Sequence, residues 1–185
     1  MAFPSAQVLG WGFCLSEIGL SLLKRSHHPS NVADRGSLRP LWITICCSVT
    51  AGILARYYLP AARIPPVLYP GGVLLFTLGL LLRWGSILYL GRLFTVDVAV
   101  AADHRVVDTG PYALIRHPSY AGALMAFAGY GICLLNAASL LLLVVPITCA
   151  FLRRMDVEEQ ALVAALGADY ASYQKRTKRL VPFVY

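Results

Sequence analysis

Five long apolar runs, separated by short polar segments, dominate the hydrophobic pattern of the chain. They cover residues 3–23, 41–59, 67–90, 118–135 and 138–152. A helix needs about 20 mostly apolar residues to cross a bilayer, so the first three runs are long enough and the last two nearly so. The pattern predicts an all-α integral membrane protein with about five transmembrane helices.

The last two apolar runs are separated by little more than Asn136. So short a connection predicts a tight helical hairpin, because neighbouring antiparallel helices are joined by short loops. Pro146 lies within the second arm and is expected to bend it. We expect this arm to continue beyond the membrane surface, and both open ends of the hairpin to lie on the same side of the membrane.

Composition supports the membrane assignment. Of the 185 residues, 58% are hydrophobic and 14% are charged, and the mean hydropathy is +0.65, whereas a soluble domain is about half apolar. The five cysteines lie in apolar runs without CxxC spacing, and the four histidines lack the spacing of a zinc site. The sequence therefore predicts no metal centre. The net charge of +7 fits contacts with anionic lipid and requires no nucleic acid.

Basic residues predict the orientation of the chain. If the loop between the first two helices faces the cytoplasm, five crossings also place most of the 16 basic residues on that side. The exceptions are Arg56, Arg63 and Arg83. The positive-inside bias therefore predicts an N-terminus outside and a C-terminus in the cytoplasm.

Two polar segments fall on the predicted cytoplasmic side. The first, residues 91–116, is a connection of about 25 residues, a length that is uncommon unless the loop is functional or disordered. Its alternating pattern at 94–98 and its turn signal at 108–111 favour an ordered lid over a simple connecting loop. The second, residues 153–179, has apolar and aromatic side chains at three- and four-residue spacings, which predicts a C-terminal amphipathic helix at the membrane interface.

The strongest candidate site stands at the start of the fourth apolar run. Residues 110–112 read GPY and residues 116–122 read RHPSYAG. Ionisable groups at this position are costly in lipid and by default mark a functional site. The hairpin places Glu158 and Glu159 on the same side of the membrane as the GPY and RHPSYAG segments, and facing them. A further carboxylate, Glu17, lies inside the first run and is expected either near its end or bonded to a neighbouring helix, with no site assigned to it.

Several segments together resemble the isoprenylcysteine carboxyl methyltransferase family, in particular its prokaryotic members. They are LGRLF at 90–94, VDTGPY at 107–112, RHPSYAG at 116–122, the pair Glu158-Glu159 with Leu162, Gly167, Tyr170 and Tyr173 downstream, and the closing Pro182-Phe183. The resemblance implies a single membrane domain with two parts. Residues 1–90 would form three N-terminal transmembrane helices, and residues 91–185 the catalytic, cofactor-binding region.

The resemblance implies an enzyme that transfers a methyl group from S-adenosylmethionine to the terminal carboxylate of a prenylated cysteine. The cofactor site would not be built on a Rossmann sheet, and the sequence agrees, since it contains no strand followed by GxGxxG. By similarity, Gly122 would let the cofactor approach the backbone, and one of the two glutamates would accept hydrogen bonds from its ribose or amino group. The residues implied to contact the cofactor are Tyr112, His117, Tyr120, Gly122, Glu158 and Glu159.

The proposed chemistry depends on alignment, because a carboxylate is already ionised near neutral pH. Arg116 and Arg176 are the candidates for binding the acceptor carboxylate in a bidentate manner. The resemblance adds Glu159 as the third implied catalytic residue. The acceptor stays open among a prenyl-cysteine, another isoprenoid carboxylate and a lipid amine. The alternative functions are a phospholipid or lipid-amine N-methyltransferase, an NADPH-dependent membrane reductase of the sterol type, and a non-catalytic transporter or scaffold.

Overall fold

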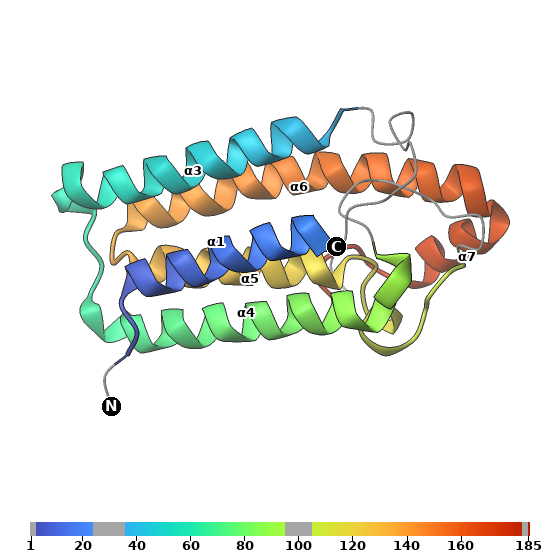
Figure 1. Cartoon of the computed structure of the whole chain (residues 1–185), viewed down its shortest axis with the longest axis horizontal. Coiled ribbons are helices and arrows are strands. Elements are labelled where there is room, and N and C mark those ends of the chain that lie inside the picture. Colours follow the sequence, from blue (N-terminus) through green and yellow to red (C-terminus); the bar gives the residue numbers. More distant parts are fainter. Residues whose placement is uncertain (1–2, 24–35, 95–104, 183–184) are drawn as a thin grey trace.

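The structure is a computed structural model that describes residues 3–23, 36–94, 105–182 and 185. Over these residues the protein is all-α, as predicted (Figure 1). The α-helices are α1 (Ala6–Leu23), α3 (Leu38–Tyr58), α4 (Tyr69–Leu90), α5 (Pro118–Cys133), α6 (Ala137–Leu166) and α7 (Ala168–Arg176). The short 3-10 helices are η1 (Pro60–Ala62), η2 (Pro66–Leu68), η3 (Gly91–Leu93) and η4 (Gly110–Ala113).

Four of the described helices are long and apolar enough to span a membrane, namely α1, α3, α4 with its flanking turns, and α6. The fifth predicted span, α5, has 16 residues. At 1.5 Å per residue it is about 24 Å long, shorter than a hydrocarbon core of about 30 Å. It lies between α4 and α6 with α1 against it (Figure 1), and most of its side chains are buried. Because other helices enclose α5, little of it faces lipid, and it does not need to match the full thickness of the hydrocarbon core.

Glycines bring the backbones of α4 and α5 into contact. A Cβ added to Gly122 would lie 2.5 Å from the backbone nitrogen of Arg83, and one added to Gly79 would lie 2.6 Å from the carbonyl oxygen of Gly122. Gly72, seven residues before Gly79, and Gly129, seven residues after Gly122, repeat the arrangement, with a Cβ at Gly72 placed 3.0 Å from the carbonyl oxygen of Gly129. This is the small-residue seam typical of membrane helix packing.

Alanine at Gly79 is expected to destabilise the bundle by about 1–3 kcal/mol, the usual cost of overpacking, because its Cβ would overlap the α5 backbone. Gly85 on the same helix is the matched control, since nothing lies within 4 Å of a Cβ at that position. Thermal unfolding in detergent should therefore show a lower midpoint for Gly79→Ala than for Gly85→Ala. Equal midpoints would contradict the glycine seam.

The predicted hairpin is formed by α5 and α6. The side-chain oxygen of Asn136 accepts a hydrogen bond from the backbone N–H of Ser139 at 3.0 Å, which caps α6. Its amide nitrogen donates to the carbonyl of Leu59 at 2.8 Å. The one polar residue of the turn therefore both starts α6 and ties the hairpin to the end of α3.

The C-terminal polar segment differs from the single amphipathic helix predicted for residues 153–179. α6 continues for 30 residues to Leu166, with Pro146 inside it, because the next helix-breaking residue is Gly167. Gly167 adopts a φ of +56°, a conformation that glycine reaches at little cost and that commonly ends helices. A separate nine-residue helix, α7, follows. This break lets α7 fold back over the start of α5.

Candidate active site

Glu159 is the centre of a buried ionic cluster at the end of the bundle near α7. Its Oε1 accepts a hydrogen bond from Arg116 Nε at 2.8 Å and lies 3.0 Å from His117 Nε2. Its Oε2 accepts from Arg179 Nη2 at 2.8 Å and from Gln174 Nε2 at 3.1 Å. The side chain is only 5% exposed. A buried carboxylate requires compensation of this kind, so these five side chains form one unit.

The segment after α7 holds Arg116 and His117 in place. The backbone N–H of Arg116 donates to the carbonyl of Lys178 at 2.7 Å, and that of His117 donates to the carbonyl of Arg179 at 3.0 Å. The Arg116 guanidinium donates to two further backbone carbonyls at the end of α7. Arg116 therefore uses its donors to join α5, α6 and the C-terminal segment.

His117 and Tyr120 are presented by the start of α5. Pro118 occupies the first helical position, where its missing N–H is not needed, and His117 directly precedes it. The hydroxyl of Tyr120 donates to Glu158 Oε2 at 3.0 Å. The two adjacent glutamates therefore have different partners, since Glu159 contacts His117 and Glu158 contacts Tyr120.

Residues 105–116 form an ordered cover over this end of the bundle. The hydroxyl of Tyr112 donates to the carbonyl of Ser86 on α4 at 3.2 Å, and the hydroxyl of Tyr173 on α7 donates to the carbonyl of Tyr112 at 2.6 Å. Burial raises the pKa of Tyr173 to about 12, so this hydroxyl stays protonated and able to donate near neutral pH. Residues 91–93 of the predicted lid form η3, and residues 95–104 lie outside the described residues.

Two of the predicted site residues lie away from the ionic cluster. Arg176 pairs with Asp108 at 3.3 Å, and their side chains are 61% and 42% exposed, so the pair is a surface contact of little energetic value. Gly122 faces α4, and the close approach that it permits is that of the Arg83 backbone. The structure thus explains Gly122 by helix packing and places Arg176 at the surface.

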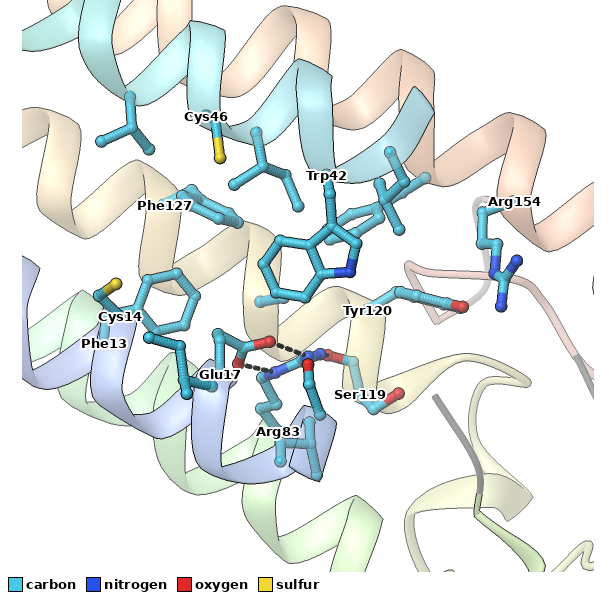
Figure 2. A pocket seen from close by; sticks show the side chains of 18 of the residues that line it. Phe13, Cys14, Glu17, Trp42, Cys46, Arg83, Ser119, Tyr120, Phe127 and Arg154 are labelled. Atoms are coloured by element: carbon cyan, nitrogen blue, oxygen red, sulfur yellow. Dashed lines mark hydrogen bonds and ion pairs between the residues drawn. The ribbon is translucent and has the colours of Figure 1, made fainter. Parts of the chain in front are cut away.

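An apolar cavity of about 310 Å³ lies between α1, α3 and α5, and Tyr120 in its wall has its ring centroid 5.5 Å from that of His117 in the ionic cluster. Its walls include the rings of Phe13, Trp42 and Phe127 (Figure 2). Polar side chains gather at one end of it, where they are contributed by Glu17, Arg83, Ser119, Tyr120 and Arg154. Its volume lies within the range of ligand-binding pockets, about 300–1,000 Å³.

Glu17 and Arg83 form an ion pair in the wall of this cavity. Nε and Nη2 of Arg83 each donate to one carboxylate oxygen of Glu17 at 2.6 Å. Nη1 of Arg83 donates to the carbonyl of Ser119 at 3.2 Å. The carboxylate within the first span is thus bonded to a neighbouring helix, one of the two expectations for it, and its partner is the basic residue inside α4.

Three polar side chains at this end of the bundle were not among the predicted site residues. Arg179 stands in a run of basic residues typical of a solvated tail, and Gln174 carries no motif. Only the reversal of the chain at Gly167 brings both to Glu159. Arg154 is 2% exposed, contacts the hydroxyl of Ser37 and lines the cavity. Its spacing of one helical turn before Glu158 was the available signal, because residues four apart share a helix face.

The fold and the site define a multi-pass membrane protein whose buried ionic cluster adjoins a lipophilic cavity. Residues 72–164 match the model of the isoprenylcysteine carboxyl methyltransferase (ICMT) family. Protein-S-isoprenylcysteine O-methyltransferase B of Arabidopsis thaliana is 34% identical over 115 residues, covering 61% of this chain and 58% of that protein. The Saccharomyces cerevisiae protein-S-isoprenylcysteine O-methyltransferase is 33% identical over 115 residues, covering 61% and 48%.

A solved structure gives the same result. The structure of the eukaryotic intramembrane Ras methyltransferase ICMT superposes on this protein with a TM-score of 0.65 and 29% sequence identity. The match covers 79% of this chain and 53% of the ICMT chain. This chain belongs to the ICMT family, because the family match covers half of its residues. The resemblance inferred from the motifs is confirmed, and the N-methyltransferase and reductase alternatives are not favoured. The chain spans less than two thirds of the length of these relatives.

Proposed function

We propose that this protein transfers a methyl group from S-adenosylmethionine to the carboxylate of a lipophilic, isoprenylcysteine-like acceptor. The observation that carries this proposal is the position of an apolar cavity of about 310 Å³, which Tyr120 separates from a buried ionic cluster. Ser119 and Tyr120, at the start of α5, link the two. Such a site suits a molecule with a lipid tail and a charged head. The relatives, which are O-methyltransferases by name, support the same reaction.

We assign the grip on the acceptor carboxylate to Arg154. Its guanidinium lies at the polar end of the cavity, near the Tyr120 ring (Figure 2), and a guanidinium can bind a carboxylate in a bidentate manner. Arg116 is less suited, because its guanidinium contacts Glu159 and backbone carbonyls that are not part of the cavity lining. Arg176 is less suited because it lies at the surface. In this proposal Arg116 is a positioning residue.

The groups around the glutamate pair fit S-adenosylmethionine. This cofactor has an ammonium group and ribose hydroxyls that need acceptors, and a carboxylate that needs donors. Glu158 supplies the acceptors, and Arg179 and Gln174, which Glu159 holds in place, supply the donors. A hollow of about 360 Å³ opens beside them, with Asp156, Gln160, Val163 and Ala164 completing its lining. When bound, the cofactor supplies an electrophilic methyl group.

In this proposal His117, Tyr120 and Tyr112 do not have to contact the cofactor themselves. They position the two glutamates and the cover formed by residues 105–116. His117 and Tyr120 bond to Glu159 and Glu158, and Tyr112 holds residues 105–116 over the site. The acceptor carboxylate is ionised near neutral pH, so no residue has to remove its proton. The contribution of the chain is alignment of the acceptor and exclusion of water.

We also propose that this site faces the cytoplasm. The end of the bundle near α7 carries several basic residues, among them Arg105, Arg153, Lys175 and Lys178, whereas the opposite end carries Arg56 and Arg63. The positive-inside rule places the more basic end in the cytoplasm. α1 begins at the opposite end (Figure 1), so the N-terminus is proposed to lie outside. The basic loop between α1 and α3, residues 24–35, lies outside the described residues.

Calorimetric titration with S-adenosylhomocysteine tests the cofactor assignment. Detergent-solubilised wild-type protein is expected to bind it saturably, and His117→Ala at least about tenfold more weakly, because a hydrogen bond to a charged group contributes about 1.5–3 kcal/mol. Arg176→Gln, a surface change, should bind like the wild type. Folded wild-type protein that binds NADPH but not S-adenosylhomocysteine would overturn the assignment.

A further inference from the structure

Tyr185 lies against the guanidinium of Arg179, at the edge of the site. The centre of its ring is 5.9 Å from Arg179 Cζ, within the distance of about 6 Å at which a cation is attracted to an aromatic face. Its hydroxyl accepts a hydrogen bond from Arg179 Nη1 at 3.2 Å. The reaction proposed above makes no use of Tyr185, although Arg179 is one of its cofactor residues.

Backbone hydrogen bonds fix the position of Tyr185. Its carbonyl oxygen accepts from the backbone N–H of Leu180 at 2.7 Å and from that of Val181 at 2.8 Å. Its own N–H donates to the carbonyl of Val181 at 3.2 Å. Directly before Leu180, the carbonyl of Arg179 accepts from the backbone N–H of His117 at 3.0 Å. The main chain therefore places the ring of Tyr185, and a change of this side chain leaves those contacts in place.

Arg179 needs a support besides Glu159. Its Nε and Nη2 both donate to the same oxygen, Glu159 Oε2, at 3.2 and 2.8 Å. Contacts that converge on one oxygen leave the guanidinium able to turn about it, unlike a fork of two nitrogens on two oxygens. Nη1 also pairs with Asp156, whose side chain is 51% exposed, and exposed pairs hold side chains weakly. The ring and the hydroxyl of Tyr185 restrict the remaining movement.

Tyr185 supports Arg179 without entering the hollow proposed for the cofactor. Arg179 and Gln174 line this hollow, whereas Tyr185 is outside its lining. Tyr185 therefore reaches the proposed cofactor site through Arg179. A side chain that is already ordered loses less freedom when it takes up a ligand, so an ordered guanidinium binds a carboxylate more tightly than a mobile one.

We propose that Tyr185 is a positioning residue for the carboxylate of the cofactor and acts through Arg179. This inference rests on the proposed function, in which Arg179 and Gln174 donate to that carboxylate. The ring and the hydroxyl of Tyr185 hold the guanidinium in the orientation that the carboxylate meets. Tyr185 thus sets the affinity for the amino acid part of the cofactor and leaves the binding of the nucleoside part and of the acceptor unchanged.

Two probes that differ in the amino acid group test this role. They are S-adenosylhomocysteine and methylthioadenosine, which keeps the nucleoside and the sulfur but lacks the carboxylate. Calorimetry on detergent-solubilised Tyr185→Leu should show about tenfold weaker binding of S-adenosylhomocysteine, or ~1.4 kcal/mol. Binding of methylthioadenosine should stay within about twofold of wild type. Tyr185→Phe keeps the ring and should recover most of the affinity. In steady-state kinetics the KM for S-adenosylmethionine should rise, while kcat and the KM for the acceptor stay unchanged.

Val181→Ala is the matched control, because it changes an exposed side chain of the same segment and keeps the backbone contacts of Tyr185. It should bind both probes like the wild type. In an Arg179→Met background, Tyr185→Leu should cause no further loss. Unchanged affinity in Tyr185→Leu, equal losses for the two probes, or a loss that persists in the Arg179→Met background would overturn the positioning role alone. Folded wild-type protein that binds neither probe would overturn the proposed function, and this inference with it.

Discussion

Glu159→Gln is expected to lower kcat/KM for methyl transfer by at least about 100-fold. The substitution keeps the size of the side chain but removes the charge on which Arg116, His117 and Arg179 converge. Breaking a buried ion pair from one side costs about 3–5 kcal/mol, and about 3 kcal/mol in the transition state corresponds to a rate loss of roughly 100-fold. Initial rates should be measured below the unfolding midpoint of the variant.

Asp156→Asn is the matched comparison for this prediction, because it changes another carboxylate of the hollow proposed for the cofactor without touching the one on which Arg116 and His117 converge. Asp156 lies one turn before Glu159 on α6 and pairs with the same Arg179 at 2.8 Å, but its side chain is 51% exposed. An exposed pair contributes about 0–1 kcal/mol, so the rate should stay within about fivefold of wild type. Similar losses in the two variants would show that Arg179 matters through its surface pair and would contradict the central role of Glu159.

Arg154→Met is expected to reduce kcat/KM for the acceptor by at least about 100-fold while leaving S-adenosylhomocysteine binding within about threefold of wild type. Methionine fills much of the volume of the arginine but cannot donate hydrogen bonds. Two charge-assisted hydrogen bonds contribute about 1.5–3 kcal/mol each. Steady-state kinetics with varied acceptor, combined with calorimetry, separate the loss of acceptor alignment from a loss of cofactor binding.

Arg176→Gln and Arg154→Lys complete this experiment. Arg176 lies at the surface, so its replacement should change kcat/KM less than about threefold. Lysine at position 154 keeps the charge without the bidentate geometry, so we expect an intermediate loss. If Arg176→Gln lost as much activity as Arg154→Met, the assignment of the carboxylate to the cavity would be wrong.

The membrane fold could be predicted from the sequence because its signals are local. Each apolar run corresponds to a helix, and Asn136 marks the hairpin turn because it is the polar residue between two such runs. The position of the site was visible for the same reason, since Arg116 and His117 stand at the start of an apolar run. The two glutamates could be placed opposite them from the hairpin topology alone.

The partners within the site could not be predicted in the same way, because they depend on contacts between distant segments. Glu17 and Arg83 are 66 residues apart, and nothing in either apolar run indicates the pairing. Gly167 predicts the end of a helix but not the direction of the next one, so the approach of Arg179 to Glu159 was missed. Gly122 belongs to a motif that suggested ligand contact, while its structural neighbour is the backbone of α4.

The most direct test of the proposed function is the formation of a methyl ester on N-acetyl-S-farnesylcysteine by the purified protein, with labelled S-adenosylmethionine as the donor. We predict a product that saturates with both substrates, releases its label in base as a carboxyl methyl ester does, and is lost in Glu159→Gln. Folded protein that binds S-adenosylhomocysteine but forms no base-labile ester, or that places the label on an amine, would contradict the proposal.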